Sequence, residues 1–163
     1  MLIVLFSTAI FAQNRCGGAT PTMKKLEYKK AVASYITLVS KKIAQELEHN
    51  IVAYKKAALL IKIKPIVNLY DPKQSSIATQ KIAENLIHAM FLEDFRIVSS
   101  EKSADSYVLG TYTNYKNGML LNVRIADKKS GYIYSSAQVF LTKKELKSID
   151  KIYNRYNWFS ENN

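Results

Sequence analysis

The chain contains one cysteine, Cys16, and only two histidines, His49 and His88, among its 163 residues. A single cysteine excludes a disulfide within the chain and a structural zinc site of the cysteine type. The two histidines do not form a His-Glu-x-x-His motif, and no Gly-x-Ser-x-Gly segment is present. With so few histidines, a Ser-His-Asp type of nucleophile lacks a convincing general base.

Glycine is also scarce. The five glycines lie at positions 17, 18, 110, 118 and 131, and this spacing builds no phosphate-binding loop. Asp105 and Asp127 could form a carboxylate pair, but Asp127 lies at the end of a predicted hairpin, where aspartate usually accepts hydrogen bonds from turn amides. We therefore expect a protein that is not an enzyme, without catalytic residues, cofactor or metal site.

Acidic residues are fewer than basic residues. The chain has 13 Asp and Glu and 24 Lys and Arg, which give a formal net charge of +11. Such a charge can attract nucleic acid, anionic lipid or peptidoglycan. The lysines, however, are scattered in pairs along the chain. Five tyrosines of the predicted strands could stack on bases, although packing within the sheet accounts for them better: Tyr107, Tyr112, Tyr115, Tyr132 and Tyr134. We expect no nucleic-acid partner and keep binding of nucleic acid or an anionic surface as the alternative function.

Long hydrophobic runs are limited to the start of the chain. Residues 1–12 are uncharged and mainly apolar, but a membrane-spanning helix needs about 20 such residues. The run is typical of an export signal ending at Ala12, although no basic residue precedes it, and the alternative is a buried strand from Leu2 to Phe6. We predict a signal peptide over 1–12 and no integral membrane span. Cys16 follows Arg15 instead of a small residue, which argues against a lipid anchor.

The next segments predict a linker, a helix and a strand. Gly, Pro and small polar residues over 13–25 are typical of a linker. From Val32 to Leu47 apolar residues recur at three- and four-residue steps, which predicts an amphipathic helix. The run from Leu59 to Leu69 alternates like a half-buried strand. Because proline lacks the ladder N–H, Pro65 places this strand at a sheet edge or at a bulge.

A second helix and a short strand follow this strand. Ser75 or Ser76 can cap a helix whose apolar face includes Ile82 and Met90. The segment from Phe95 to Val98 is a short β-rich run. Together with the preceding elements, these segments predict helix, strand, helix and strand in succession.

A three-strand meander and a final helix complete the predicted domain. The β-rich runs 107–115 and 119–126 flank Asn117-Gly118, a pair that tolerates positive φ at both central positions of a type I′ hairpin. A turn over 128–131 leads to a strand over 132–141. Thr142 and Glu145 then form a capping box.

This order predicts an α+β fold: a two-layer sandwich with an antiparallel sheet, a three-strand meander and helices on one face. We place the domain at residues 26–141. A C-terminal amphipathic helix and tail occupy 142–163.

Two groups of residues are candidates for partner binding. Asn122 and Arg124 are two residues apart on one strand, so both side chains leave the same face of the sheet. They could contact a partner, but the interpretation that we favour is structural: Arg124 pairs with Asp127 or a neighbouring strand. The terminal helix carries aromatic residues of a kind enriched at protein interfaces: Tyr153, Tyr156, Trp158 and Phe159. Packing of this helix on its own domain is an equal alternative.

Several segments, taken in order, resemble the FlgO family. Gly110-Thr111-Tyr112-Thr113 is close to the Gly-Thr-Tyr-Thr motif of that family, and Asn122-Val-Arg124-Ile-Ala-Asp127 resembles its Asn-x-Arg-x-x-Asp pattern. Ser130-Gly131 is similar to its Thr-Gly turn. The strand Leu59–Leu69, the helix around Ile82–Leu86 and the strand Phe95–Val98 precede these motifs in the family's order. The resemblance covers about half of the chain.

The resemblance implies a flagellar accessory protein of the bacterial cell envelope that has no catalytic role and is needed for motility. The implied location is the periplasm, in association with the outer membrane or the flagellar basal body. The implied partners are other flagellar motor or envelope proteins. Self-assembly into a ring or disk would make the chain a scaffold component of a polar flagellar motor.

Overall fold

The computed structural model describes the backbone of residues 21–160, and the side chains of that range apart from residues 21–29, 53, 54 and 154–160. The predicted signal peptide over 1–12 lies outside the described residues, as does the predicted linker up to residue 20. Residues 21–25, also assigned to the linker, form the first part of a helix that starts at Pro21. Proline suits the first turn of a helix because the N–H groups there have no partner within the helix.

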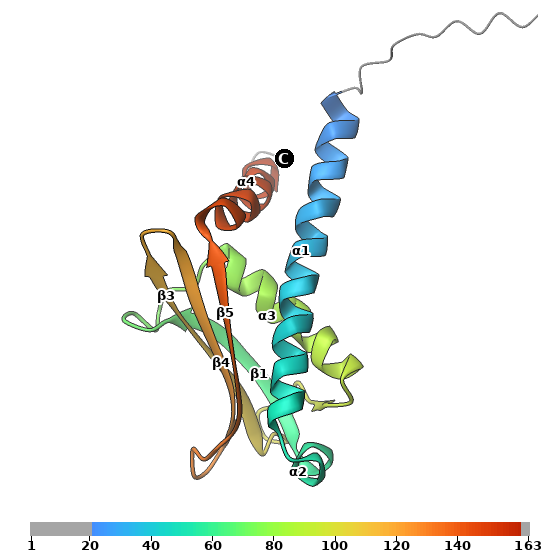
Figure 1. Cartoon of the computed structure of the whole chain (residues 1–163), viewed down its shortest axis with the longest axis vertical. Helices are drawn as coiled ribbons and strands as arrows, with labels where there is room; N and C mark the ends of the chain where they lie inside the picture. Colours follow the sequence, from blue (N-terminus) through green and yellow to red (C-terminus); the bar gives the residue numbers. More distant parts are fainter. Residues whose placement is uncertain (1–20, 161–163) are drawn as a thin grey trace, which may run out of the picture.

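The described elements follow the predicted order, with one addition, the short helix α2 (Figure 1). In chain order they are α1 (Pro21–Asn50), α2 (Ala53–Ala58), β1 (Leu60–Asn68), α3 (Ile77–Leu92), β2 (Arg96–Ile97), β3 (Ser106–Tyr115), β4 (Gly118–Asp127), β5 (Ile133–Thr142) and α4 (Lys143–Ser160). The predicted cap of the second helix is confirmed at Ser76, whose Oγ accepts a hydrogen bond from Thr79 N at 3.1 Å.

The strands form one mixed sheet in the order β2-β1-β3-β4-β5. The predicted meander is confirmed, since β3, β4 and β5 pair in antiparallel fashion. The prediction of an antiparallel sheet is wrong for the rest, because β1 runs parallel to both β2 and β3. The connection explains the difference: α3 carries the chain back across the sheet, so the strands that follow enter in the direction of β1.

β1 contains the predicted irregularity at its proline. Its register with β3 shifts between Ile63 and Ile66, the segment that holds Pro65. The bulge is therefore confirmed, although β1 is not the outermost strand. Ile66 lies opposite Gly110, where a Cβ atom would come within 2.5 Å of Ile66 Cγ1. Glycine at this position allows β1 and β3 to approach each other.

The helices cover one face of the sheet, as predicted (Figure 1). Completely buried side chains come from both layers: Ile36, Ile43, Leu47, Ile61, Ile66, Ile82, Leu86, Met90, Met119, Leu121, Ile125 and Leu141. Two buried hydroxyls link the layers, because Ser40 Oγ donates to Ile82 O at 3.2 Å and Ser135 Oγ donates to Leu47 O at 2.7 Å. The opposite face of the sheet carries polar residues together with Leu109, Leu120 and Phe140.

The final helix is capped as predicted and belongs to the core. Thr142 N donates to Glu145 Oε2 at 2.7 Å, and Glu145 N donates to Thr142 Oγ1 at 3.4 Å. Within α4, Ile149 is completely buried and Ile152 is 9% exposed. Removing the helix would take Ile149 and Ile152 out of the core, so deletion of residues 142–163 would impair folding as well as any partner binding by this helix.

The β3–β4 hairpin forms where predicted, but its turn differs. Tyr115 pairs with Gly118, so the two loop residues are Lys116 and Asn117. Among the described residues, only Asp94 and Gly131 have positive φ. The prediction of a type I′ turn centred on Asn117-Gly118 is therefore wrong. Gly118 lies instead in a tight contact with β5, where a Cβ atom would be 2.1 Å from Leu141 O.

Candidate functional site

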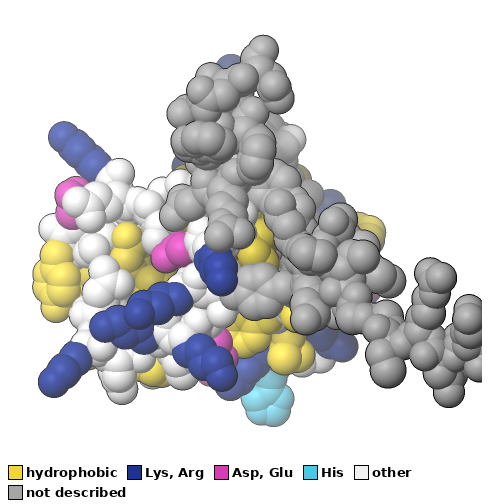
Figure 2. All heavy atoms as spheres, turned by 90° about the horizontal axis from the view of Figure 1, so that it is seen from above, with side chains coloured by type: hydrophobic (Ala, Val, Ile, Leu, Met, Phe, Trp, Pro, Cys, Tyr) yellow, Lys and Arg dark blue, Asp and Glu magenta, His cyan; other side chains and the backbone are white. Residues whose placement is uncertain are grey.

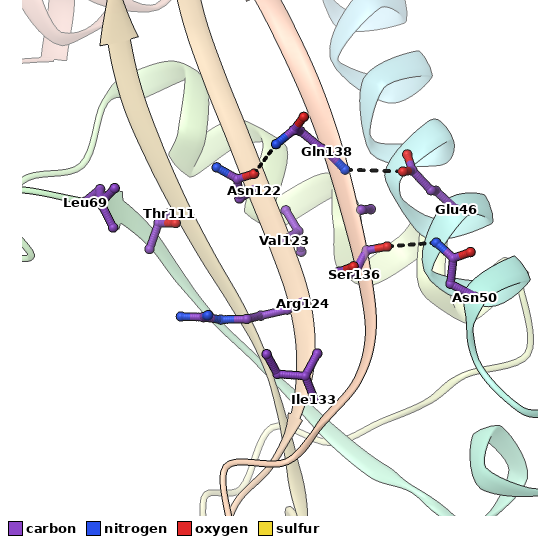
Figure 3. A pocket seen from close by; sticks show the side chains of 11 residues that line it. Glu46, Asn50, Leu69, Thr111, Asn122, Val123, Arg124, Ile133, Ser136 and Gln138 are labelled. Atoms are coloured by element: carbon purple, nitrogen blue, oxygen red, sulfur yellow. Dashed lines mark hydrogen bonds between the residues drawn. The ribbon is translucent and has the colours of Figure 1, made fainter.

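The uncovered face of the sheet contains a hollow of about 510 Å³ that several strands line (Figure 3). Thr111, Asn122 and Arg124 lie on β3 and β4, and Ser136 and Gln138 on β5. These side chains share a face because successive residues of a strand point to opposite sides. In β4 the alternation is clear, since Leu121, Val123 and Ile125 are buried while Arg124 is exposed. We call this region the open-face hollow.

The middle of the open-face hollow is a row of three polar residues in register. Thr111 is the partner of Asn122 across β3 and β4, and Asn122 is the partner of Gln138 across β4 and β5. Gln138 Nε2 donates to Asn122 Oδ1 at 2.6 Å. This bond orients the Asn122 amide so that its Nδ2 group points away from β5 (Figure 3).

Arg124 lies next to this row and extends across the sheet (Figure 3). The sequence favoured pairing with Asp127 or a neighbouring strand, yet no ion pair or hydrogen bond within the described residues involves its guanidinium. Asp127 binds other groups, as described below. The structure therefore brings Asn122 and Arg124 to one surface, and the structural role that we favoured for Arg124 is not observed.

The other charged residue that lines the hollow, Glu46, is held by the backbone of β5. Glu46 Oε1 accepts a hydrogen bond from Gln138 N at 3.4 Å, and Asn50 Nδ2 donates to Ser136 O at 2.9 Å. Both residues belong to α1 and lie on the opposite side of the β5 ribbon from Arg124 (Figure 3). Glu46 thus covers the edge of the sheet and does not neutralise Arg124.

A second polar cluster on the same side of the sheet surrounds Glu101. Its carboxylate binds Lys62 Nζ at 3.0 Å and Lys64 Nζ at 2.8 Å, and accepts a hydrogen bond from the Tyr107 hydroxyl. Hydrogen bonds from Lys64 above all, and then from Tyr107 and Lys62, lower the pKa of Glu101 to about 2. The lysines that interrupt the first strand of the sheet therefore have an acidic partner, which sequence reasoning did not identify.

The Asp127 carboxylate organises the turn between β4 and β5. Asp127 Oδ1 accepts hydrogen bonds from Ser130 N at 2.7 Å, Ser130 Oγ at 2.8 Å and Lys129 N at 2.9 Å. Tyr134 OH donates to Oδ2 at 3.1 Å. Led by the bonds from Ser130, these contacts lower the pKa of Asp127 from 3.8 to about 2. The structural role predicted for Asp127 is confirmed.

This shift predicts a pH dependence of stability. Because the pKa of Asp127 is lower in the folded chain, its contribution is present above pH 3.8 and is lost as the pH falls toward 2. Asp127→Asn should lower the urea midpoint at about pH 5 and reduce its further fall at about pH 3. Glu84→Gln, an exposed carboxylate on α3, is the control. Equal pH dependence in Asp127→Asn and the unchanged chain would contradict the assignment.

The meander tyrosines do not form one stacking surface. Tyr112 is 4% exposed and belongs to the core face. Tyr107 lies on the opposite face, with Lys64 Nζ 4.4 Å from its ring centre. Tyr132 and Tyr134 pack edge to face, with ring centres 5.4 Å apart. Tyr107, Tyr112 and Tyr134 therefore pack within the fold as predicted, whereas Tyr115 and Tyr132 are 53% and 66% exposed.

Of the aromatic residues predicted to bind a partner through α4, one is described. Tyr153 is partly buried against the core, and Lys81 Nζ lies 5.4 Å from its ring centre. The side chains of Tyr156, Trp158 and Phe159 lie outside the described residues. Their role in partner binding stays a prediction.

The basic residues do not gather into one patch at the end of the molecule shown in Figure 2. Lys and Arg side chains project there from several separate places, with acidic side chains among them. Within residues 21–160, no helix combines the length and hydropathy that a membrane span needs. In the part of the chain that the structure describes, no group of three His, Cys, Asp or Glu residues could hold a metal ion.

The fold and the open-face hollow define an α+β domain with a helix-covered mixed sheet. Within it, residues 90–146 match the family model described as FlgO protein. The match begins in α3, contains β2 to β5 and ends in the first turn of α4. It confirms the resemblance to the FlgO family over this segment, which includes Thr111, Asn122 and Arg124. No curated protein sequence matches the chain.

The chain is also similar to several solved structures. The C-terminal domain of LpoB from Salmonella enterica is 10% identical, with a TM-score of 0.47 over 64% of this chain and 96% of that one. LpoB from E. coli is 12% identical, with a TM-score of 0.43 over 62% and 66%. PelC from Paraburkholderia phytofirmans, solved as a dodecamer, is 15% identical, with a TM-score of 0.36 over 57% and 82%.

Proposed function

We propose that this chain is a non-enzymatic structural protein of the bacterial cell envelope. It acts in the periplasm as a scaffold of the flagellar motor, is required for motility and works through contacts with other proteins. The observation that carries this proposal is the match of residues 90–146 to the FlgO family.

Some of the motif residues serve the fold and others lie on the open face, and this difference supports a role in binding a partner. Gly110 and Tyr112 are used by the fold, the first for the approach of β1 and the second in the core. Thr111 and Arg124 point to the open face instead and line the hollow. Side chains that the core does not use and that lie together on an uncovered face are suited to binding a partner.

The proposed partners are other flagellar motor or envelope proteins, and a second copy of the chain if it assembles into a ring or disk. Two surfaces are proposed to make the contacts. One is the open-face hollow with Asn122 and Arg124. The other is the end of α4 with Tyr156, Trp158 and Phe159.

Deletion of the gene in its own bacterium tests the proposal. We expect reduced swimming in soft agar and an altered periplasmic part of the motor in tomographic images, both restored by the full chain supplied in trans. Determining the compartment and N-terminal residue of the mature protein tests export in the same strain. Normal swimming together with normal motor images would refute the proposed function.

A further inference from the structure

The open-face hollow contains hydrogen-bond donors that the fold leaves available. Gln138 binds the Asn122 oxygen, so the two N–H bonds of Asn122 Nδ2 remain. The five N–H groups of Arg124 have no acceptor within the described residues. A guanidinium forms its strongest planar contact with a carboxylate, through two parallel N–H···O bonds.

On the side of the hollow where Arg124 lies, the charge of the lining residues is positive. The other charged lining residue is Glu46, which binds Gln138 N from across β5. Nearby Asp127 is occupied by Ser130, Lys129 and Tyr134. A carboxylate brought by a partner therefore meets a guanidinium that no acid of the described chain neutralises.

Apolar side chains border the same hollow. Leu69, after β1, is 51% exposed, and Ile133, at the start of β5, is 49% exposed. They lie on the sides of the hollow, with Arg124 between them in the view of Figure 3. A ligand that fits presents an acidic group and apolar side chains on one side. An extended peptide with Leu, Glu and Leu at every second position does so, because alternate residues of an extended chain point to the same side.

We propose that the open-face hollow binds an acidic, extended segment of a partner protein, with Arg124 and Asn122 Nδ2 holding a carboxylate. The inference rests on the proposed function, because it names the chemistry of the partner for one of its two surfaces. The chain's net charge of +11 would speed the encounter with an acidic segment. Arg124 supplies the local contact with the carboxylate. Its contribution to binding is therefore distinct from that of the net charge.

Titration of the ¹⁵N-labelled full chain with two peptides tests the proposal. The probe is an acetylated, amidated peptide with Leu, Glu and Leu at every second position and Ser between them, and its match carries Gln in place of Glu. We expect the acidic peptide to shift the amide signals of Thr111, Asn122 and Arg124, and the neutral peptide to leave them unchanged. Arg124→Gln should weaken binding about tenfold, as expected for loss of a charged hydrogen-bond pair.

Arg96→Gln is the matched control, because Arg96 is an exposed arginine on β2 outside the hollow. It removes the same charge and should leave the affinity within about twofold of the unchanged chain. Equal weakening by Arg96→Gln and Arg124→Gln would overturn the proposal and indicate binding by net charge alone. Equal binding of both peptides, or no shifts in the hollow, would also overturn it.

The outcome is separable from that of the deletion experiment. Loss of motility on deletion, with no peptide binding at the hollow, would keep the scaffold function and refute the acidic partner. Peptide binding that depends on Arg124, with normal swimming and normal motor images on deletion, would support the binding surface and refute the flagellar role.

Discussion

Replacing Leu121 by alanine should lower the free energy of unfolding by about 2–5 kcal/mol, whereas the same change at its neighbour Leu120 should lower it by less than about 1 kcal/mol. The two residues are chemically identical and adjacent on β4. Leu121 is completely buried beneath the helices, so its truncation removes apolar contacts and leaves a cavity. Leu120 lies on the open face and is only partly buried.

Urea unfolding of the two variants followed by circular dichroism measures this difference. Equal midpoints would mean that the helices do not cover the face of the sheet that carries Leu121. A larger loss for Leu120→Ala would mean that the open face is covered instead. Because both variants remove the same atoms, a difference between them reports the environment and not the side chain.

Gly118→Ala should lower the free energy of unfolding by about 1–3 kcal/mol, the usual cost of overpacking. The new Cβ atom would lie 2.1 Å from Leu141 O and 2.7 Å from Phe140 Cζ. The phenylalanine ring can move, but the carbonyl belongs to the backbone of β5. The neighbouring turn is also fixed, since Lys143 N donates to Asn117 O at 2.8 Å.

Asparagine at position 118 separates this explanation from the one that the Asn-Gly motif predicts. If Gly118 were needed for positive φ, asparagine would be tolerated much better than alanine, because it adopts that conformation more readily. If the contact with Leu141 decides, both variants lose stability to a similar extent. Thermal or urea unfolding of Gly118→Ala and Gly118→Asn measures the comparison, and a nearly unchanged Gly118→Asn would contradict the structure.

The sequence predicted the elements well because their hydrophobic periods are clear. It did not predict the turn register, and the alternation of β3 and β4 shows why. A turn at Lys116-Asn117 and one at Asn117-Gly118 differ in the register with which β3 and β4 pair, but both registers leave the same residues on the core face. Hydrophobic pattern therefore cannot choose between them. The choice depends on Gly118 and Leu141, which are far apart in sequence.

The direction of β1 was missed for a related reason. Its alternating pattern is compatible with either direction, and only its partners β2 and β3 determine that it runs parallel. For the candidate site, spacing alone placed Asn122 and Arg124 on one face. Spacing could not show that Thr111 and Gln138 join them, because those contacts depend on strand register. The turn contacts of Asp127 were predicted, but they also leave Arg124 without the partner that the sequence favoured.

The contacts of α1 with β5 have a consequence for assembly. Glu46 and Asn50 bind Gln138 N and Ser136 O, the outward backbone groups that an added strand would need. This part of the sheet is thus closed to β-augmentation. Copies of the chain that associate into a ring through this part of the molecule would recognise one another through side chains. Recognition of that kind depends on residue identity, which discriminates between partners better than backbone pairing, because backbone groups are common to all sequences.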